Sequence, residues 1–279
     1  MRHDPLREAF RALKLRLRAA RARREAQVRL DAWDGGRPHG LPGPLVVSLK
    51  SYPLRFPTLA HTLRGLLAQT VRADATILWL GHGDVEALPP EVLALRAHGL
   101  EVRETRDLRS FTKIVPALRA FPDAHLVTAD DDMAYGGDWL ERLLRAAPGD
   151  VACLRAHRVA VAGGAAGPYD AWARNLPAPE RGPLVFPTGV GGVLYPPGGL
   201  HEDAARDDLF AALCPTADDV WLWWMHRLAG RTASKLGGRA RLVEWPGSQG
   251  TALRAGNLRG GANDRAVAAM TARYGLPLS

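Results

Sequence analysis

Short apolar runs alternate with helical patterns over residues 45–146, and this alternation restricts the fold more than any other feature of the sequence. The runs are five or six residues long, and the segments between them place apolar residues three and four positions apart. Strands are expected at 45–50, 75–80, 100–105 and 125–129, with helices at 58–69, 91–98, 110–121 and 138–146. Such an alternation is typical of a doubly wound, largely parallel α/β sheet, which binds ligands at the carboxyl ends of its strands.

The second half of the chain is less regular. Strands are expected at 151–161, 184–195 and 241–245, and helices at 204–213, 218–228 and 264–274. A composition of 47% hydrophobic and 24% charged residues excludes a wholly disordered or fibrous chain. The two cysteines are too few for a disulfide scaffold. No run of 18 apolar residues that could span a membrane is present, and neither is a secretory signal. A cytoplasmic location is therefore expected.

The positive charge is concentrated at the N-terminus. The whole chain of 279 residues has a net charge of +8, yet residues 1–30 alone carry ten basic and three acidic side chains. The other 249 residues hold 27 basic and 26 acidic side chains and are almost neutral. Nucleic-acid binding is therefore disfavoured, because the body has no basic excess and the arm has no interleaved aromatic residues.

The first 33 residues predict a basic amphipathic helix. Leu6, Phe10, Leu13, Leu17 and Ala20 would share one face. Two interpretations stay open: attachment to an anionic membrane, on the inner face of the plasma membrane, or docking of the apolar face on the domain or on a partner. A Gly/Pro-rich linker at 34–44 then separates the arm from a single domain at 45–279.

Three adjacent aspartates, Asp130, Asp131 and Asp132, follow directly after the expected strand at 125–129. Adjacent carboxylates repel one another unless a cation lies among them. Asp130 and Asp132 can point the same way, and Mg²⁺ or Mn²⁺ binds through one or two carboxylates together with substrate phosphates. A metal–phosphate site is favoured over a solvated acidic turn, because the triplet lies at a strand's carboxyl end.

Other polar segments are expected at the same edge of the sheet. Ser48, Lys50, Ser51 and Tyr52 end the first strand, where a nucleotide is expected in an open α/β sheet. Lys113 is either a phosphate-binding cation or a surface lysine. Glycines at 189, 191 and 192 either allow close approach of a ligand to the backbone or form strand bulges.

The segment at 218–228 begins with Asp218 and Asp219. Such a carboxylate is a general base for a sugar hydroxyl, or it caps the first turn of the helix. The residues alone leave both readings open. Within this helix Trp221 and Trp224 are expected in the core, whereas Trp223 is a weak candidate for stacking on a sugar.

Five segments in order resemble the bacterial GT-A glycosyltransferases that are similar to glycosyltransferase family 2. The resemblance covers roughly residues 45–275, and its segments lie at 47–56, 108–117, 127–140, 191–197 and 217–222. It implies a GT-A fold with a mostly parallel central sheet, a nucleotide-diphosphate-sugar donor and a divalent metal at a DxD motif.

The resemblance also implies roles for individual residues. It matches Asp130 and Asp132 to the metal and Asp219 to the catalytic base of inverting members. The residues that it matches to donor binding are Ser48, Tyr52, Arg55, Lys113, Asp130, Asp131, Gly191 and Gly192. Lys50 departs from the small polar residue expected at its position, and a QxxRW motif is absent, which argues against a processive synthase.

The sequence thus predicts a metal-dependent glycosyltransferase that acts on a surface glycan or glycolipid precursor. A sugar-phosphate nucleotidyltransferase is the enzymatic alternative, although residues 49–53 do not form the Gly-rich phosphate loop expected after its first strand. The other alternative is a non-catalytic module that binds a membrane surface or nucleic acid through the basic arm.

Overall fold

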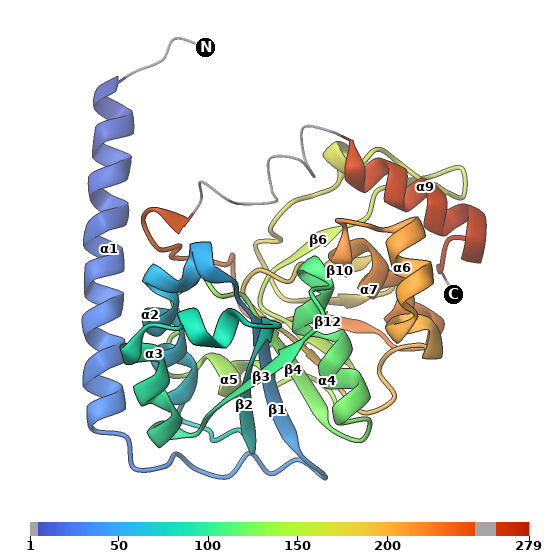
Figure 1. The fold of residues 1–279 in the computed structure, drawn as a ribbon. Helices are drawn as coiled ribbons and strands as arrows, with labels where there is room; N and C mark the ends of the chain where they lie inside the picture. The colour runs from blue at the N-terminus through green and yellow to red at the C-terminus, as the bar shows by residue number, and fades with distance from the viewer. Residues whose placement is uncertain (1–4, 249–260, 279) are drawn as a thin grey trace.

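A sheet of eight strands with helices on both faces is the centre of the computed structural model, which describes residues 5–248 and 261–278 (Figure 1). The strands of the sheet are β1 (Leu45–Lys50), β2 (Ala75–Gly81), β3 (Leu100–Thr105), β4 (His125–Ala129), β5 (Val151–Cys153), β9 (Glu180–Gly182), β11 (Val193–Tyr195) and β12 (Ala233–Lys235). The described helices are α1 (Pro5–Asp31), α2 (Phe56–Leu67), α3 (Pro90–Leu93), α4 (Val115–Ala120), α5 (Trp139–Leu143), α6 (Asp207–Leu213), α7 (Asp218–Leu228) and α9 (Ala262–Tyr274).

The strands lie in the order β3-β2-β1-β4-β11-β5-β12-β9. The first four are mutually parallel, and β12 is parallel to β5, whereas β11 runs antiparallel between β4 and β5. Two small ribbons lie outside this sheet, β6 (Ala156–Arg158) with β10 (Val185–Pro187), and β7 (Val161–Ala162) with β8 (Ala165–Ala166). The expected α/β architecture with a large, mostly parallel central sheet is confirmed.

Two hydrophobic cores cover the two faces of the sheet. Successive strand residues point to opposite faces, so Val46 joins one core while Leu45 and Val47 join the other. Buried side chains of α2 and α5 complete the core on the side of Leu45. Those of α4, α6, α7 and α9 complete the opposite core. This layering fixes β1 and β4 at the middle of the molecule, with their carboxyl ends at one edge.

Several expected elements differ from those observed. The expected strand at 151–161 is divided into β5 and β6, and the one at 184–195 into β10 and β11. The expected helix at 110–121 is divided into a 3-10 helix, η4 (Arg109–Lys113), and α4, whose second residue is Pro116. The strand expected at 241–245 is wrong: only an isolated bridge joins Glu244 to Met133. The late strand of the sheet is β12 instead.

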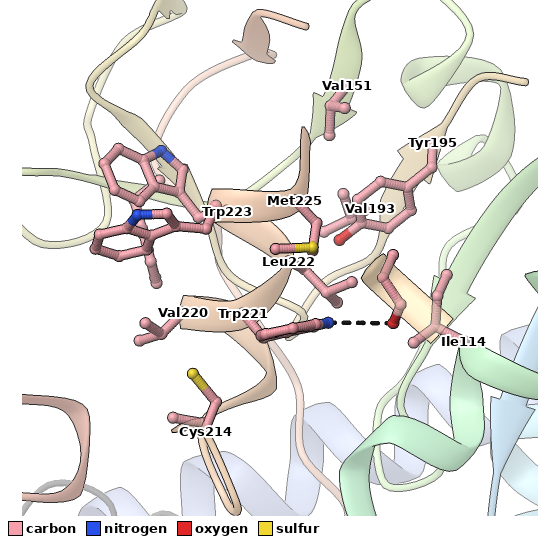
Figure 2. Close-up of a cluster of buried hydrophobic side chains, with 14 of the residues drawn as sticks. Ile114, Val151, Val193, Tyr195, Cys214, Val220, Trp221, Leu222, Trp223 and Met225 are labelled. Carbon is pink, nitrogen blue, oxygen red and sulfur yellow. Dashed lines mark hydrogen bonds between the residues drawn. The ribbon is translucent and has the colours of Figure 1, made fainter. Parts of the chain in front are cut away.

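Trp223 is not available for stacking on a ligand. It is 1% exposed, and its indole N–H donates to the carbonyl of Val185. Figure 2 shows Trp223 and Trp221 on different sides of α7, both within the cluster of buried side chains. Trp224 is also fully buried. The prediction that Trp221 and Trp224 are core residues is therefore confirmed, and the stacking role suggested for Trp223 is wrong.

The N-terminal arm is a helix, α1, which packs against α2. The residues of α1 that the structure describes as buried are Ala19, Ala26 and Leu30. None of them belongs to the apolar stripe expected from the sequence. Arg29 donates to the carbonyl of Tyr135, which also joins the helix to the body. Among the described residues, no helix combines the length and apolar character that crossing a membrane requires.

Candidate functional site

A cleft of about 540 Å³ lies at the carboxyl ends of β1 and β4. Its volume is within the range of small-molecule sites. The side of the cleft formed by the sheet is acidic, with the aspartate triplet after β4 and the aspartate pair at the start of α7. Two segments that are far apart in sequence therefore bring five carboxylates to one site.

Each aspartate of the triplet has a different partner. Asp130 Oδ1 lies 3.0 Å from Lys113 Nζ. Asp131 Oδ2 accepts a hydrogen bond of 2.6 Å from the Ser51 hydroxyl. Asp132 Oδ2 accepts one of 2.7 Å from the Arg55 guanidinium. Cationic side chains thus lie beside Asp130 and Asp132, and the triplet is not a simple solvated turn.

Backbone contacts hold the triplet in place. The Thr62 hydroxyl lies 2.9 Å from the carbonyl oxygens of both Asp131 and Met133, and the Trp245 indole donates to that hydroxyl at 2.8 Å. The Asp130 amide donates to the Tyr135 hydroxyl at 2.8 Å. These contacts explain why the segment at 241–245 lies beside the triplet although it is not a strand.

Burial changes the acidity of the triplet. The loss of hydration raises the pKa of Asp131 to about 6, despite its hydrogen bond with Ser51. It also raises the pKa of Asp132, with repulsion by Asp130 as the next cause and the Arg55 charge opposing both. Asp130 and Asp132 are therefore close enough to repel each other.

Lys113 is the cation at the centre of the acidic side. Its ammonium group lies 3.0 Å from Asp130 and 3.2 Å from Asp218, and the side chain is only 10% exposed. Burial alone would lower the pKa of Lys113, but the combined charges of these aspartates and of Asp219 hold it well above its ordinary value. Lys113 is thus charged at neutral pH, and it is not a surface lysine.

Asp219 lies at the start of α7, facing Gly189. Its Oδ1 accepts a hydrogen bond of 2.8 Å from the Gly189 amide. Burial, followed by repulsion from Asp218, raises the pKa of Asp219 to about 7, while the Lys113 charge opposes the rise. A carboxylate with this pKa can accept and release a proton near neutral pH. The residue before α7 is Ala217, whose side chain makes no capping hydrogen bond, and the Asp219 carboxylate bonds to the Gly189 amide outside the helix.

Gly189 is close to both charged groups. A Cβ atom at this position would lie 2.8 Å from Lys113 Nζ and 3.1 Å from Asp219 Oδ1. The glycine therefore allows the backbone amide to reach Asp219 without displacing the lysine.

Three residues that the resemblance assigned to donor binding do not line the cleft. Ser48 is fully buried, donates to the Lys113 carbonyl at 2.6 Å and accepts from the Trp79 indole at 2.9 Å. Gly191 accepts from the Trp139 indole at 2.8 Å, and a Cβ on Gly192 would lie 2.5 Å from the Trp139 ring. These three residues support the site from behind, whereas Tyr52, Arg55, Lys113, Asp130, Asp131, Asp132 and Asp219 line the cleft.

Basic and aromatic side chains also line the cleft, and the sequence did not indicate them. Arg155, His157, Tyr169, Arg174 and Asn175 line it. Arg155 donates to the Thr188 hydroxyl at 2.8 Å. Burial, together with the Arg155 charge, lowers the pKa of His157 to about 4, so its ring is neutral at neutral pH. These residues come from the irregular half of the chain, where no periodic pattern or motif marks them.

The donor set in the cleft fits a metal that enters together with a diphosphate. Among the residues that the structure describes, no group of three or more His, Cys, Asp or Glu side chains is arranged to hold an ion. Asp130 and Asp132 are the candidate ligands, since Mg²⁺ needs only one or two carboxylates when phosphates and water supply the remaining ligands.

Comparison with known proteins gives a likeness only to solved structures, and it is a distant one. No protein-family model matches the chain, and no curated protein is significantly similar to it. Among solved structures, it is similar to the inositol-1-phosphate CTP transferase from T. maritima, with a TM-score of 0.42 and 10% sequence identity. That match covers 80% of this chain and 98% of the other. A likeness at this TM-score is too weak to assign a function, so the function is inferred from the residues of the cleft.

Proposed function

We propose that this protein is a GT-A glycosyltransferase that moves a sugar from a nucleotide-diphosphate donor to a hydroxyl of a surface glycan or glycolipid precursor. The observation that carries the proposal is the position of Lys113, within 3.2 Å of both Asp130 and Asp218. This contact joins the aspartate triplet, which is expected to bind the diphosphate, to the Asp218–Asp219 pair, which is expected at the acceptor. Both groups therefore belong to one cleft.

Asp219 is the catalytic base in this proposal. The acceptor oxygen forms a bond to the anomeric carbon, and the bond from that carbon to the diphosphate oxygen breaks. The acceptor proton goes to the Asp219 carboxylate, and the nucleoside diphosphate leaves. The raised pKa of Asp219 supports this role, because a base works best when its pKa lies near the operating pH. Attack from the face opposite the leaving group would invert the anomeric centre.

The donor is expected between β1 and the triplet. Tyr52 and Arg55 follow β1 directly, and Arg55 is held by its ion pair with Asp132. Lys113 provides a fixed positive charge beside the position expected for the diphosphate. Asp130 and Asp132 would hold Mn²⁺ or Mg²⁺, which, when bound, would offset the charge that develops on the leaving diphosphate.

A sugar-phosphate nucleotidyltransferase is the alternative that uses a similar donor set. It would join a nucleoside triphosphate to a sugar phosphate and release pyrophosphate. In this chain β1 is followed by Ser51, Tyr52 and a 3-10 helix, η1 (Pro53–Arg55), without any glycine. A backbone cradle for a triphosphate is therefore not evident at this position.

One screen tests the proposal against this alternative. The full-length protein is incubated with a panel of nucleotide-diphosphate sugars and glycan acceptors, with Mn²⁺ or with a chelator. Release of nucleoside diphosphate that depends on Mn²⁺ is expected. Pyrophosphate release from a nucleoside triphosphate and a sugar 1-phosphate would support the alternative instead. Release of nucleoside diphosphate that is unaffected by the chelator would contradict the proposed metal site at Asp130 and Asp132.

A further inference from the structure

The outer face of α1 carries apolar side chains that the body of the protein does not cover. Phe10 is 68% exposed, Leu13 53% and Leu17 63%. Large apolar side chains at this exposure, next to one another on one helix, mark an interaction surface. Because this stripe remains exposed while the helix is packed on α2, docking of the stripe on the domain is wrong.

The stripe and the packed face lie on nearly opposite sides of the helix. At 3.6 residues per turn, the mean direction of Phe10, Leu13 and Leu17 is rotated by roughly 150° from that of the buried residues, Ala19, Ala26 and Leu30. Small side chains dominate the packed face, and large ones the outer face. The helix can therefore stay packed on the body while its outer face contacts something else.

Basic side chains border the stripe on both sides. Lys14, Arg18 and Arg21 lie on one side of the stripe, Arg16 on the other and Arg24 in line with it, all of them exposed. On this part of the helix the only described acidic side chain is Glu25, which pairs with Arg21. The headgroup region of an anionic bilayer can accept inserted apolar side chains and, in the same plane, several positive charges. It is therefore the partner that this surface fits.

The direction of α1 brings this surface toward the active edge. The chain turns back after α1 and enters β1 in the opposite direction, and the N-terminal half of the helix stands free of α2 and α3 (Figure 1). The free half thus extends toward the end of the molecule where the parallel strands have their carboxyl ends. A bilayer bound to its outer face would lie alongside α1, on the side of the helix away from α2.

We propose that the outer face of α1 lies on an anionic lipid surface, with Phe10, Leu13 and Leu17 inserted between headgroups and the flanking basic residues paired with lipid phosphates. This surface function does not depend on the reaction in the cleft. A second copy of the chain is the competing occupant of the stripe, but two such helices would bring their basic borders together.

Vesicle flotation of the full-length protein tests the proposal. The probes are vesicles of phosphatidylcholine alone and vesicles that also contain phosphatidylglycerol, at low and at high NaCl concentration. The wild type is expected to bind the anionic vesicles, and high salt is expected to weaken that binding. The variant Phe10→Gln/Leu13→Gln/Leu17→Gln should bind at least about tenfold more weakly, which corresponds to ~1.4 kcal/mol of binding free energy.

Two further variants provide matched comparisons. Leu93→Gln/Leu278→Gln removes exposed apolar side chains from the body and should bind as the wild type does. Lys14→Gln/Arg18→Gln/Arg24→Gln keeps the stripe and should lose the preference for anionic vesicles. Circular dichroism and thermal unfolding verify that each variant is folded.

Three results would overturn the proposal. The first is that the wild type does not float with anionic vesicles. The second is that the stripe variant floats as the wild type does. The third is that light scattering shows the wild type as a dimer and the stripe variant as a monomer. The last result would assign the stripe to a second copy of the chain. None of these measurements requires a nucleotide sugar, so they are independent of the screen for transferase activity.

Discussion

The ammonium group of Lys113 lies 3.0 Å from the Asp130 carboxylate, at the centre of the acidic side of the cleft. Lys113 belongs to a 3-10 helix before α4, and Asp130 follows β4, so this ion pair fixes a loop to the edge of the sheet. The same ammonium group contacts Asp218 at 3.2 Å. One buried cation therefore balances carboxylates from two distant segments.

Removing the Lys113 charge is predicted to reduce both stability and activity. In Lys113→Met the buried carboxylates lose their cation, and the loss of one partner from a buried ion pair costs about 3 kcal/mol. Denaturant unfolding at pH 8 should show this loss. Donor turnover should fall by about 10²-fold, the effect of removing one fixed charge near a leaving group. Unchanged stability would contradict the ion pairs described for Lys113.

Adding a single methyl group at Gly189 is predicted to disturb catalysis more than folding. The Cβ of Gly189→Ala would lie 2.8 Å from Lys113 Nζ, so the flexible lysine must move away. We expect turnover to fall by about tenfold or more. The loss of thermal stability should be smaller than in Lys113→Met, because the lysine is displaced but its charge stays beside the carboxylates. Gly182→Ala is the matched control, because nothing lies within 4 Å of its Cβ.

The raised pKa of Asp219 predicts that Asp219→Asn stabilises the protein in a pH-dependent way. The unfolded chain has the ordinary pKa of 3.8, and the folded protein has one of about 7. The folded state then binds more protons between these values, so this group lowers stability as the pH rises through that window. At pH 8 the buried charge is fully present, and the neutral amide should raise the unfolding free energy by roughly 2 kcal/mol.

At pH 5 the same substitution is predicted to stabilise the protein less than at pH 8, because pH 5 lies near the lower end of the window between 3.8 and 7. Asp219 is then already protonated in the folded protein, and only its ionisation in the unfolded chain still favours unfolding. Urea unfolding of both proteins at pH 5 and pH 8 gives the comparison. Equal stabilisation at the two pH values, or destabilisation at pH 8, would contradict the raised pKa.

The sequence predicted the parallel half of the sheet and the acidic residues at its edge well. The ranges of β1, β3 and β4 are as expected: β1 and β4 are short, mainly apolar runs, whereas β3 alternates apolar and polar residues over its first four positions. The start of α7 at Asp218 is also as expected. Since strand ends and helix starts meet at the edge of the sheet, the positions of Asp130 and Asp219 followed from local pattern alone.

The parts that failed depend on contacts between distant segments. β12 is a short Ala-Ser-Lys strand whose residues are buried between β5 and β9, and nothing in its own sequence is typical of a strand. Trp223 is buried because α7 is apolar on nearly all sides and is covered by β10 as well as by α9. The basic and aromatic lining around Arg155 likewise arises from the folding of irregular segments onto one another.

The most direct test of the central claim compares sugar transfer by the wild type and by Asp219→Asn, using a donor and acceptor identified in the screen. Donor affinity is measured in parallel, by calorimetry with Mn²⁺ present. Transfer should fall by about 10²- to 10⁴-fold, because the general base is lost, while donor affinity stays unchanged. An Asp219→Asn protein that transfers sugar at the wild-type rate would contradict the assignment of Asp219 as the base.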